Sequence, residues 1–194
     1  MKSALAERLN ELPQRLLADD VKHGRGLGNE LGFFIFDFDP EVELQVRRQI
    51  PSIIARMATV EPGFSVASVN LFGEIIGLLQ DQDLLDRAIE LEQELGLVET
   101  LDALRQAVSP VDVARRIVAR HPPSQTDLYL LHGIGSAYPL MRAHALLSNL
   151  HSPLQGKPLV MFFPGRFTGR RLVLFGKLQD DHYYRAFRLF ENPC

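Results

Sequence analysis

The sequence is poor in cysteine and has no long apolar run. Its 194 residues include a single cysteine, Cys194, which has no partner for an internal disulfide, so a reducing cytoplasm is the expected compartment. No segment approaches the roughly 18 uninterrupted apolar residues of a membrane span, and the first twenty residues mix acids with bases, unlike a signal peptide. With 46% hydrophobic residues, the chain can bury a core without a metal or disulfides.

A strong charge of either sign is also missing, because the formal net charge is −3. The distribution is nevertheless uneven. The residues from 151 onward hold seven Lys and Arg against three acids, and the first 150 hold 14 bases against 21 acids. This asymmetry is compatible with a docking face for an acidic partner or a nucleic acid, and also with basic side chains on the solvent face of strands.

Hydrophobic periodicity predicts helices and strands in alternation. The run at 33–38 is too apolar for a half-exposed strand and is typical of a strand that is covered on both faces, as in a parallel sheet. The other predicted strands are 64–72, 127–132 and 157–163. The predicted helices are 2–19 with a bend near Pro13, 39–57 with a kink or break at Pro51, and 74–121 with breaks near Gly96 and at Ser109-Pro110.

These elements predict one three-layer, Rossmann-like α/β domain over residues 1–194 with a mostly parallel sheet. It begins with an N-terminal helix (1–20) and a glycine-rich loop (22–32). In the tail, 171–178 and 183–190 alternate apolar and polar residues on either side of a polar turn, which predicts a C-terminal antiparallel hairpin.

Residues 129–150 combine an apolar strand, a glycine turn and a predicted long helix, in the order that nucleotide-binding proteins use. No Lys-Ser or Lys-Thr pair follows Gly133 and Gly135, so the P-loop motif is absent, and Tyr138 stands where a dinucleotide fingerprint has its third glycine. Ser136 is expected to cap the helix. Tyr138 and Arg142, four residues apart, would share one helix face, which favours a packing turn whose helix contacts a partner.

Asp37 and Asp39 give the sharpest enzymatic alternative. Two aspartates spaced by one residue after a buried strand resemble the pair of haloacid-dehalogenase-type phosphohydrolases, which share a magnesium ion. The later strands lack the Thr or Ser that would hold the phosphate. The six histidines show no zinc spacing. We therefore expect no metal, no cofactor and no catalytic residues, with capping by Asp39 and a hydrogen-bonded Asp37.

Arginine and aromatic residues gather in the last third of the chain. Such a mixture can follow phosphates and stack on bases, but protein interfaces favour the same residues, and a pI near 6.1 argues for protein contact. The residues that we predict to bind a partner are Tyr138, Arg142, Arg166, Arg170, Arg171, Tyr183, Tyr184 and Arg185.

Four stretches together resemble the BrxB family, a small component of the bacterial BREX (bacteriophage exclusion) defence system: FFIFDFDPE, GIGSAYPLMRAHALLSNL, KPLVMFFPGRFTGRRLVLFGKL and QDDHYYRAFRL. The resemblance implies a cytoplasmic, non-catalytic adaptor that works beside a PglZ-type protein, a large ATPase and a DNA adenine methyltransferase. It transfers no catalytic residue. A divergent magnesium-dependent phosphohydrolase or nucleotide-binding protein, and a DNA-contacting module of the same complex, are the alternatives.

Overall fold

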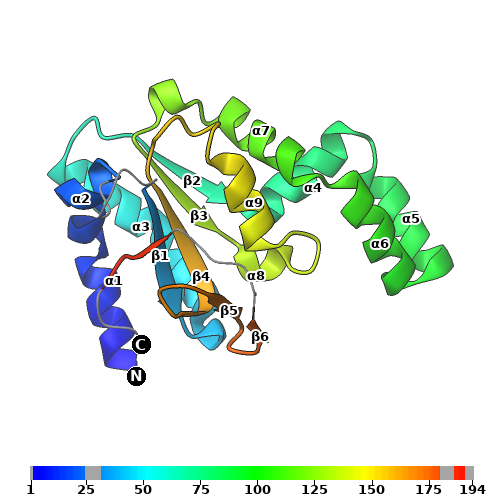
Figure 1. Ribbon diagram of the computed structural model, residues 1–194, viewed down its shortest axis with the longest axis horizontal. Helices are drawn as coiled ribbons and strands as arrows, with labels where there is room; N and C mark the ends of the chain where they lie inside the picture. Colours follow the sequence, from blue (N-terminus) through cyan, green and yellow to red (C-terminus); the bar gives the residue numbers. More distant parts are fainter. Residues whose placement is uncertain (1, 25–31, 180–185, 191–194) are drawn as a thin grey trace.

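The structure is a computed structural model that describes residues 2–24, 32–179 and 186–190 (Figure 1). Seven strands of the described residues form one sheet. Its main path runs β2-β3-β4-β1-β7, and every neighbouring pair on this path is parallel. The strands on this path are β1 (Phe33–Phe38), β2 (Val66–Asn70), β3 (Leu128–His132), β4 (Leu159–Phe167) and β7 (Phe187–Arg188).

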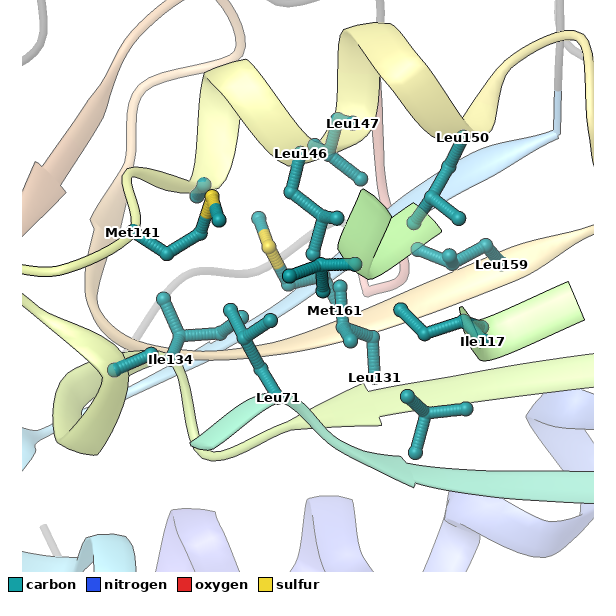
Figure 2. Packing of buried hydrophobic residues seen from close by; sticks show 14 of the residues in the cluster. Leu71, Ile117, Leu131, Ile134, Met141, Leu146, Leu147, Leu150, Leu159 and Met161 are labelled. Atoms are coloured by element: carbon teal, nitrogen blue, oxygen red, sulfur yellow. The ribbon is translucent and has the colours of Figure 1, made fainter. Parts of the chain in front are cut away.

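Helices cover both faces of the sheet, which confirms the predicted three-layer α/β class. Alternate side chains of β1 explain why: Phe34, Phe36 and Phe38 pack on one side with α1 and α3, while Phe33 and Ile35 pack on the other with α4, α7 and α9. Figure 2 shows the second core, with the leucines of α9 pointing onto β3 and β4. These helices are α1 (Lys2–Leu16), α3 (Glu43–Val60), α4 (Leu71–Asp81), α7 (Pro110–Arg120) and α9 (Ala143–Leu150).

The shorter helices follow the predicted breaks. Gly96 separates α5 (Leu85–Leu95) from α6 (Leu97–Ala107), and Ser109 caps α7 because its Oγ accepts the Val111 N–H at 3.2 Å. Pro13 and Pro51 lie inside α1 and α3 without ending them. The remaining helical segments are α2 (Asp19–Lys22), η1 (Pro40–Val42), η2 (Pro123–Gln125) and α8 (Ile134–Ala137). No helix of the described residues is long and apolar enough to span a bilayer.

The C-terminal part of the chain contains an antiparallel hairpin as predicted, but it is formed by other strands. β5 (Leu172–Leu174) pairs with the end of β4 and with β6 (Leu178–Gln179), so the predicted pairing of 171–178 with 183–190 is wrong for the described residues. β7 instead joins the other edge of the sheet, parallel to β1. Burial accounts for the choice, since Leu189 is 1% exposed there and its N–H donates to the Ile35 carbonyl at 3.0 Å.

The predicted long helix after the glycine turn is also wrong, because it is broken in two. α8 ends at Ala137, Tyr138 is extended, and Arg142 is the extended N-cap residue of α9. A proline has no N–H to donate and disfavours the helical conformation in the residue before it, so Pro139 interrupts the helix at Tyr138. Ser136 therefore lies inside α8 and does not cap it, and Tyr138 and Arg142 do not share a helix face.

Candidate functional site at the carboxyl edge of the sheet

Open α/β sheets bind ligands beyond the carboxyl ends of their strands, where neighbouring strands send their connections over opposite faces. In this sheet β1 leads to α3 on one face and β3 leads to α8 on the other. β4 lies between β1 and β3. The carboxyl ends of these three strands are therefore the position at which a nucleotide would be expected.

The chain fills this position with its own side chains. A Cβ atom on Gly135 would lie 2.6 Å from Glu43 Oε2, 2.9 Å from a ring carbon of Phe175 and 3.2 Å from Pro164 Cγ. The Glu43 carboxylate also accepts the backbone N–H of Gly135, which is the kind of group that would hold a phosphate. Because a carboxylate repels an anion and already uses this N–H, the residues of the turn do not fit a bound nucleotide.

Burial raises the pKa of Glu43, while the nearby Arg47 guanidinium and the Gly135 N–H act in the opposite direction. Its second oxygen, Oε1, is buried with no hydrogen-bond partner among the described residues. A half-buried carboxylate of this kind is held in place by packing more than by solvation. Closing the crevice with Glu43 therefore costs solvation of its carboxylate, which is partly removed from water.

Beside Glu43, polar side chains form contacts between β2 and β3 and between α3 and α8. His132 Nε2 lies 3.2 Å from Ser68 Oγ, and Arg47 Nη1 donates to Ser136 Oγ at 3.3 Å. Burial, with help from Arg47, lowers the pKa of His132 to about 4, so the ring is neutral at pH 7. Its Nδ1 has no hydrogen-bond partner in the described part of the chain. The pair therefore lacks the acid that orients a catalytic histidine.

The two aspartates after β1 have separate structural roles. Asp37 is buried, accepts the Phe167 N–H at 3.0 Å and lies 3.4 Å from Arg8 Nη2 and 3.8 Å from Arg188 Nη1. Asp39 caps η1 by accepting the Glu41 N–H at 3.0 Å. These contacts confirm the expected hydrogen bonding and capping.

A magnesium ion does not fit this arrangement, since Asp37 already faces two guanidinium groups and Asp39 is used by a backbone N–H. Within residues 2–24, 32–179 and 186–190, no three His, Cys, Asp or Glu side chains are grouped closely enough to hold a metal ion. The geometry gives no support to the phosphohydrolase alternative.

Two of the predicted partner-binding residues meet at a hollow of about 280 Å³. Tyr138 and Arg142 line it from the segment between α8 and α9, opposite the β5–β6 hairpin. Tyr138 also packs edge-to-face on Phe175, with ring centroids 6.3 Å apart. The floor is apolar, with Phe163 and Leu172, while the exposed Arg142 and Lys177 are at its margin. An apolar floor with cationic margins is typical of a protein-binding surface.

Among the described residues, Arg166, Arg170 and Arg171 do not line this hollow. Arg166 pairs with Val173 across the β4–β5 hairpin, on the face opposite to Phe167 and Leu172, which are buried. Arg170 and Arg171 are exposed at the turn, where their N–H groups donate to Thr168 Oγ1 at 3.4 and 3.0 Å. Tyr183, Tyr184 and Arg185 lie outside the described residues.

Sequence reasoning missed Glu43 and Phe175, which close the crevice, and also Arg47 and His132 among the polar side chains beside it. One signal was available, because Glu43 lies in the first turn of the helix after β1 and His132 ends β3, and such positions meet at the carboxyl edge of a parallel sheet. The position of Phe175 depends on the β4–β5 pairing, which the sequence pattern did not give.

The fold and the site define a class: a three-layer α/β protein whose ligand crevice is closed by its own side chains. A family model described as "BREX protein BrxB" matches residues 67–189. The chain belongs to the BrxB family, and this confirms the resemblance seen in the sequence.

Two relatives named "BREX protein BrxB" match nearly the whole chain. One, from Bacillus cereus (strain H3081.97), is 36% identical over 190 residues, covering 96% of this chain and 97% of the relative. The other, from Escherichia coli O9:H4 (strain HS), is 34% identical over 188 residues, covering 95% and 91%. No solved structure matches the chain. Membership of the family gives the chain a part in BREX phage defence, among the other BREX proteins.

Proposed function

We propose that this chain is a non-catalytic assembly subunit of its BREX system, and that it binds the PglZ-type protein through the hollow beside Tyr138 and Arg142. The observation that carries this proposal is the closed crevice. Glu43 lies against Gly135 where a phosphate would lie, so the sheet presents a filled edge. The neighbouring hollow is open, with an apolar floor and two exposed cations at its margin.

The chemistry of the hollow suits a protein better than a small ligand. Tyrosine and arginine are the residues that most often anchor protein interfaces, and truncating an anchor costs about 2 kcal/mol or more. Tyr138 is fixed by its contact with Phe175, so it presents a pre-organised ring at little entropic cost. The occupant we expect is an apolar side chain with a carboxylate beside it.

The test is a binding titration between this chain and the PglZ-type protein of the same genome. The double variant Arg142→Glu with Lys177→Glu changes two exposed side chains at the margin, and we expect it to weaken binding at least tenfold. The matched control is Arg115→Glu, an exposed arginine on α7 away from the hollow. Unchanged affinity in the folded double variant would reject the hollow as the binding surface.

Calorimetry with ATP, GTP and magnesium separates this proposal from the nucleotide-binding alternative, for which heat of binding would be required. One further candidate function is a DNA contact on the side of the hairpin away from the hollow. It is suggested by three exposed arginines, Arg166, Arg170 and Arg171. That candidate requires DNA binding that weakens with salt and with replacement of Arg170 and Arg171.

A further inference from the structure

The helices α5 and α6 form an arm that stands away from the sheet, at the right of Figure 1. Gly96 makes the turn between them with φ +89°. The arm, described in full, has one buried side chain: Thr100, whose hydroxyl donates to the Gly96 carbonyl at 2.8 Å. At its base, Arg105 Nε donates to the Pro139 carbonyl at 3.3 Å. A pair of helices with so little burial is poorly stabilised by its own core.

The tip of the arm is apolar and exposed. Leu95, Leu97 and Val98 flank Gly96 and are 56%, 60% and 68% exposed. Single exposed apolar residues are ordinary on protein surfaces, as Leu44 and Val60 on α3 illustrate. Three within four residues, at the end of a projecting element, form a contiguous patch, which is typical of an interaction site.

The flanks of the tip are acidic. Residues 85–107 contain six acids and two arginines, a balance of −4. Both arginines are already paired within the arm, Arg87 with Glu90 at 3.0 Å and Arg105 with Asp102 at 3.0 Å. Glu92 and Glu99, close to the tip in sequence, take part in no ion pair with another described residue. The arm therefore offers an apolar end between unneutralised carboxylates.

We propose that this tip docks into an apolar groove bordered by lysine or arginine side chains on another protein of the assembly. The charge selects the partner: carboxylates repel nucleic acid and the anionic lipid surface, and they attract a basic rim. The inference relies on the proposed function in one respect only, which is that the chain works within an assembly of several proteins. Its surface is separate from the hollow, so the two can be tested independently.

The experiment reconstitutes the full chain with the PglZ-type protein, the large ATPase and the methyltransferase of the same system, and measures the affinity for each. Two arm variants are used, Leu97→Ser with Val98→Ser for the apolar tip and Glu92→Lys with Glu99→Lys for the flanks. The matched control is Leu44→Ser with Val60→Ser, which removes two equally exposed apolar side chains from α3.

We expect the serine pair to lower the affinity for one component at least tenfold. The lysine pair should slow association and reduce its dependence on salt. The control should change neither. The hollow variant Arg142→Glu with Lys177→Glu should leave the arm-dependent binding intact, and the arm variants should leave binding at the hollow intact.

Several results would overturn the inference. Folded arm variants that bind all three proteins with wild-type affinity would remove the docking role. A change confined to self-association would assign the arm to a second copy of the chain, whose hollow also has a cationic margin. A photo-crosslinker placed at position 98 gives a second readout, because it must attach to a basic, apolar stretch of the component whose affinity falls.

Discussion

The turn at Gly135 and the turn at Gly96 use glycine for opposite reasons. At Gly135, three of the chain's own groups lie within 3.2 Å of where a Cβ would be, so the glycine permits close packing. At Gly96, the nearest atom is Glu99 Oε2 at 4.0 Å, and the glycine is needed because φ is +89°. The turn at Gly135, which resembles a ligand-binding turn, is packed against other side chains, and the turn at Gly96, which matches no known motif, is exposed.

This contrast separates structural from interactive residues. Around Gly135, side chains from α3, β4 and the segment after β5 converge, and nearby Arg47 and His132 contact Ser136 and Ser68. Around Gly96, the side chains contact little else in the described chain. Substitutions in the first region should therefore change stability, and substitutions in the second should change binding.

The largest expected effect is at Asp37, below the closed crevice. Asp37→Ala leaves Arg8 and Arg188 facing each other without the carboxylate, and we expect a loss of about 3–5 kcal/mol in the free energy of unfolding. Urea denaturation measures it. Asp39→Ala, which removes a cap, should cost only about 1 kcal/mol. Equal, small losses at both positions would contradict the structural role of Asp37.

His132 should make the stability of this region depend on pH. Its pKa is lowered in the folded state, from 6.5 to about 4, so the neutral ring is favoured and the unfolded chain binds the proton more readily. The stabilisation is complete above pH 6.5 and is lost as the pH falls towards 4, by at most about 3 kcal/mol. Comparing wild type with His132→Gln between pH 7 and 5 isolates this contribution, and parallel curves would refute it.

Gly135→Ala should destabilise the fold by about 1–3 kcal/mol, because its methyl group would overlap Glu43 and Phe175. Adding Glu43→Ala should restore part of the loss by clearing the nearer of the two groups. A double-mutant cycle in thermal denaturation measures the coupling. If the losses in stability from the two substitutions were additive, an alanine at position 135 would not be in steric conflict with Glu43.

Glu43→Gln should have a smaller effect and the opposite sign. Because burial raises the pKa of Glu43, the protonated form is favoured in the folded state, and its contribution is present at low pH and lost as the pH rises through that pKa. The amide should therefore stabilise the protein slightly at pH 7 and make no difference at acidic pH. A loss of stability at pH 7 would show that the charge itself is needed.

The smallest effect on stability is expected at the arm. Leu97→Ser with Val98→Ser should change the free energy of unfolding by no more than about 0.5 kcal/mol, since both side chains are mostly exposed. The same variant should abolish tip-dependent binding. Thermal denaturation beside the binding titration separates the two properties, and a large loss of stability would place the tip in an unrecognised contact.

Local patterns in the sequence predicted the layers of the fold because they report burial. The five apolar residues of β1 correctly indicated a strand covered on both faces, and Ser109-Pro110 correctly indicated a helix start. The pattern gave the wrong partner for the tail, because alternation alone predicted a hairpin of 171–178 with 183–190, whereas β7 pairs with β1 and β5 pairs with β4 and β6. Long-range burial of Leu189 decides that question.

The site was less predictable for a related reason. The sequence lacks a phosphate-binding motif at the Gly133–Gly135 turn, but it does not show that Glu43 fills the turn, because this depends on the connections after β1 and β3 running over opposite faces of the sheet. The shared helix face of Tyr138 and Arg142 was wrong because the pattern predicted one continuous helix, which Pro139 breaks. Both residues still reach one hollow, by a different geometry.

The short strand β7 and the residue after it contact α1, β1 and β4, which all precede it in the sequence. Arg188 donates to the Phe167 carbonyl and approaches Asp37, and the Leu189 carbonyl accepts from Arg15 Nε at 2.7 Å. These two residues therefore connect α1, β1 and β4. Their contacts span nearly the full sequence, which slows their formation relative to local helices. A nascent chain that still lacks residues 187–189 leaves the outer edge of β1 without a paired strand, which is the kind of edge that other chains can pair with.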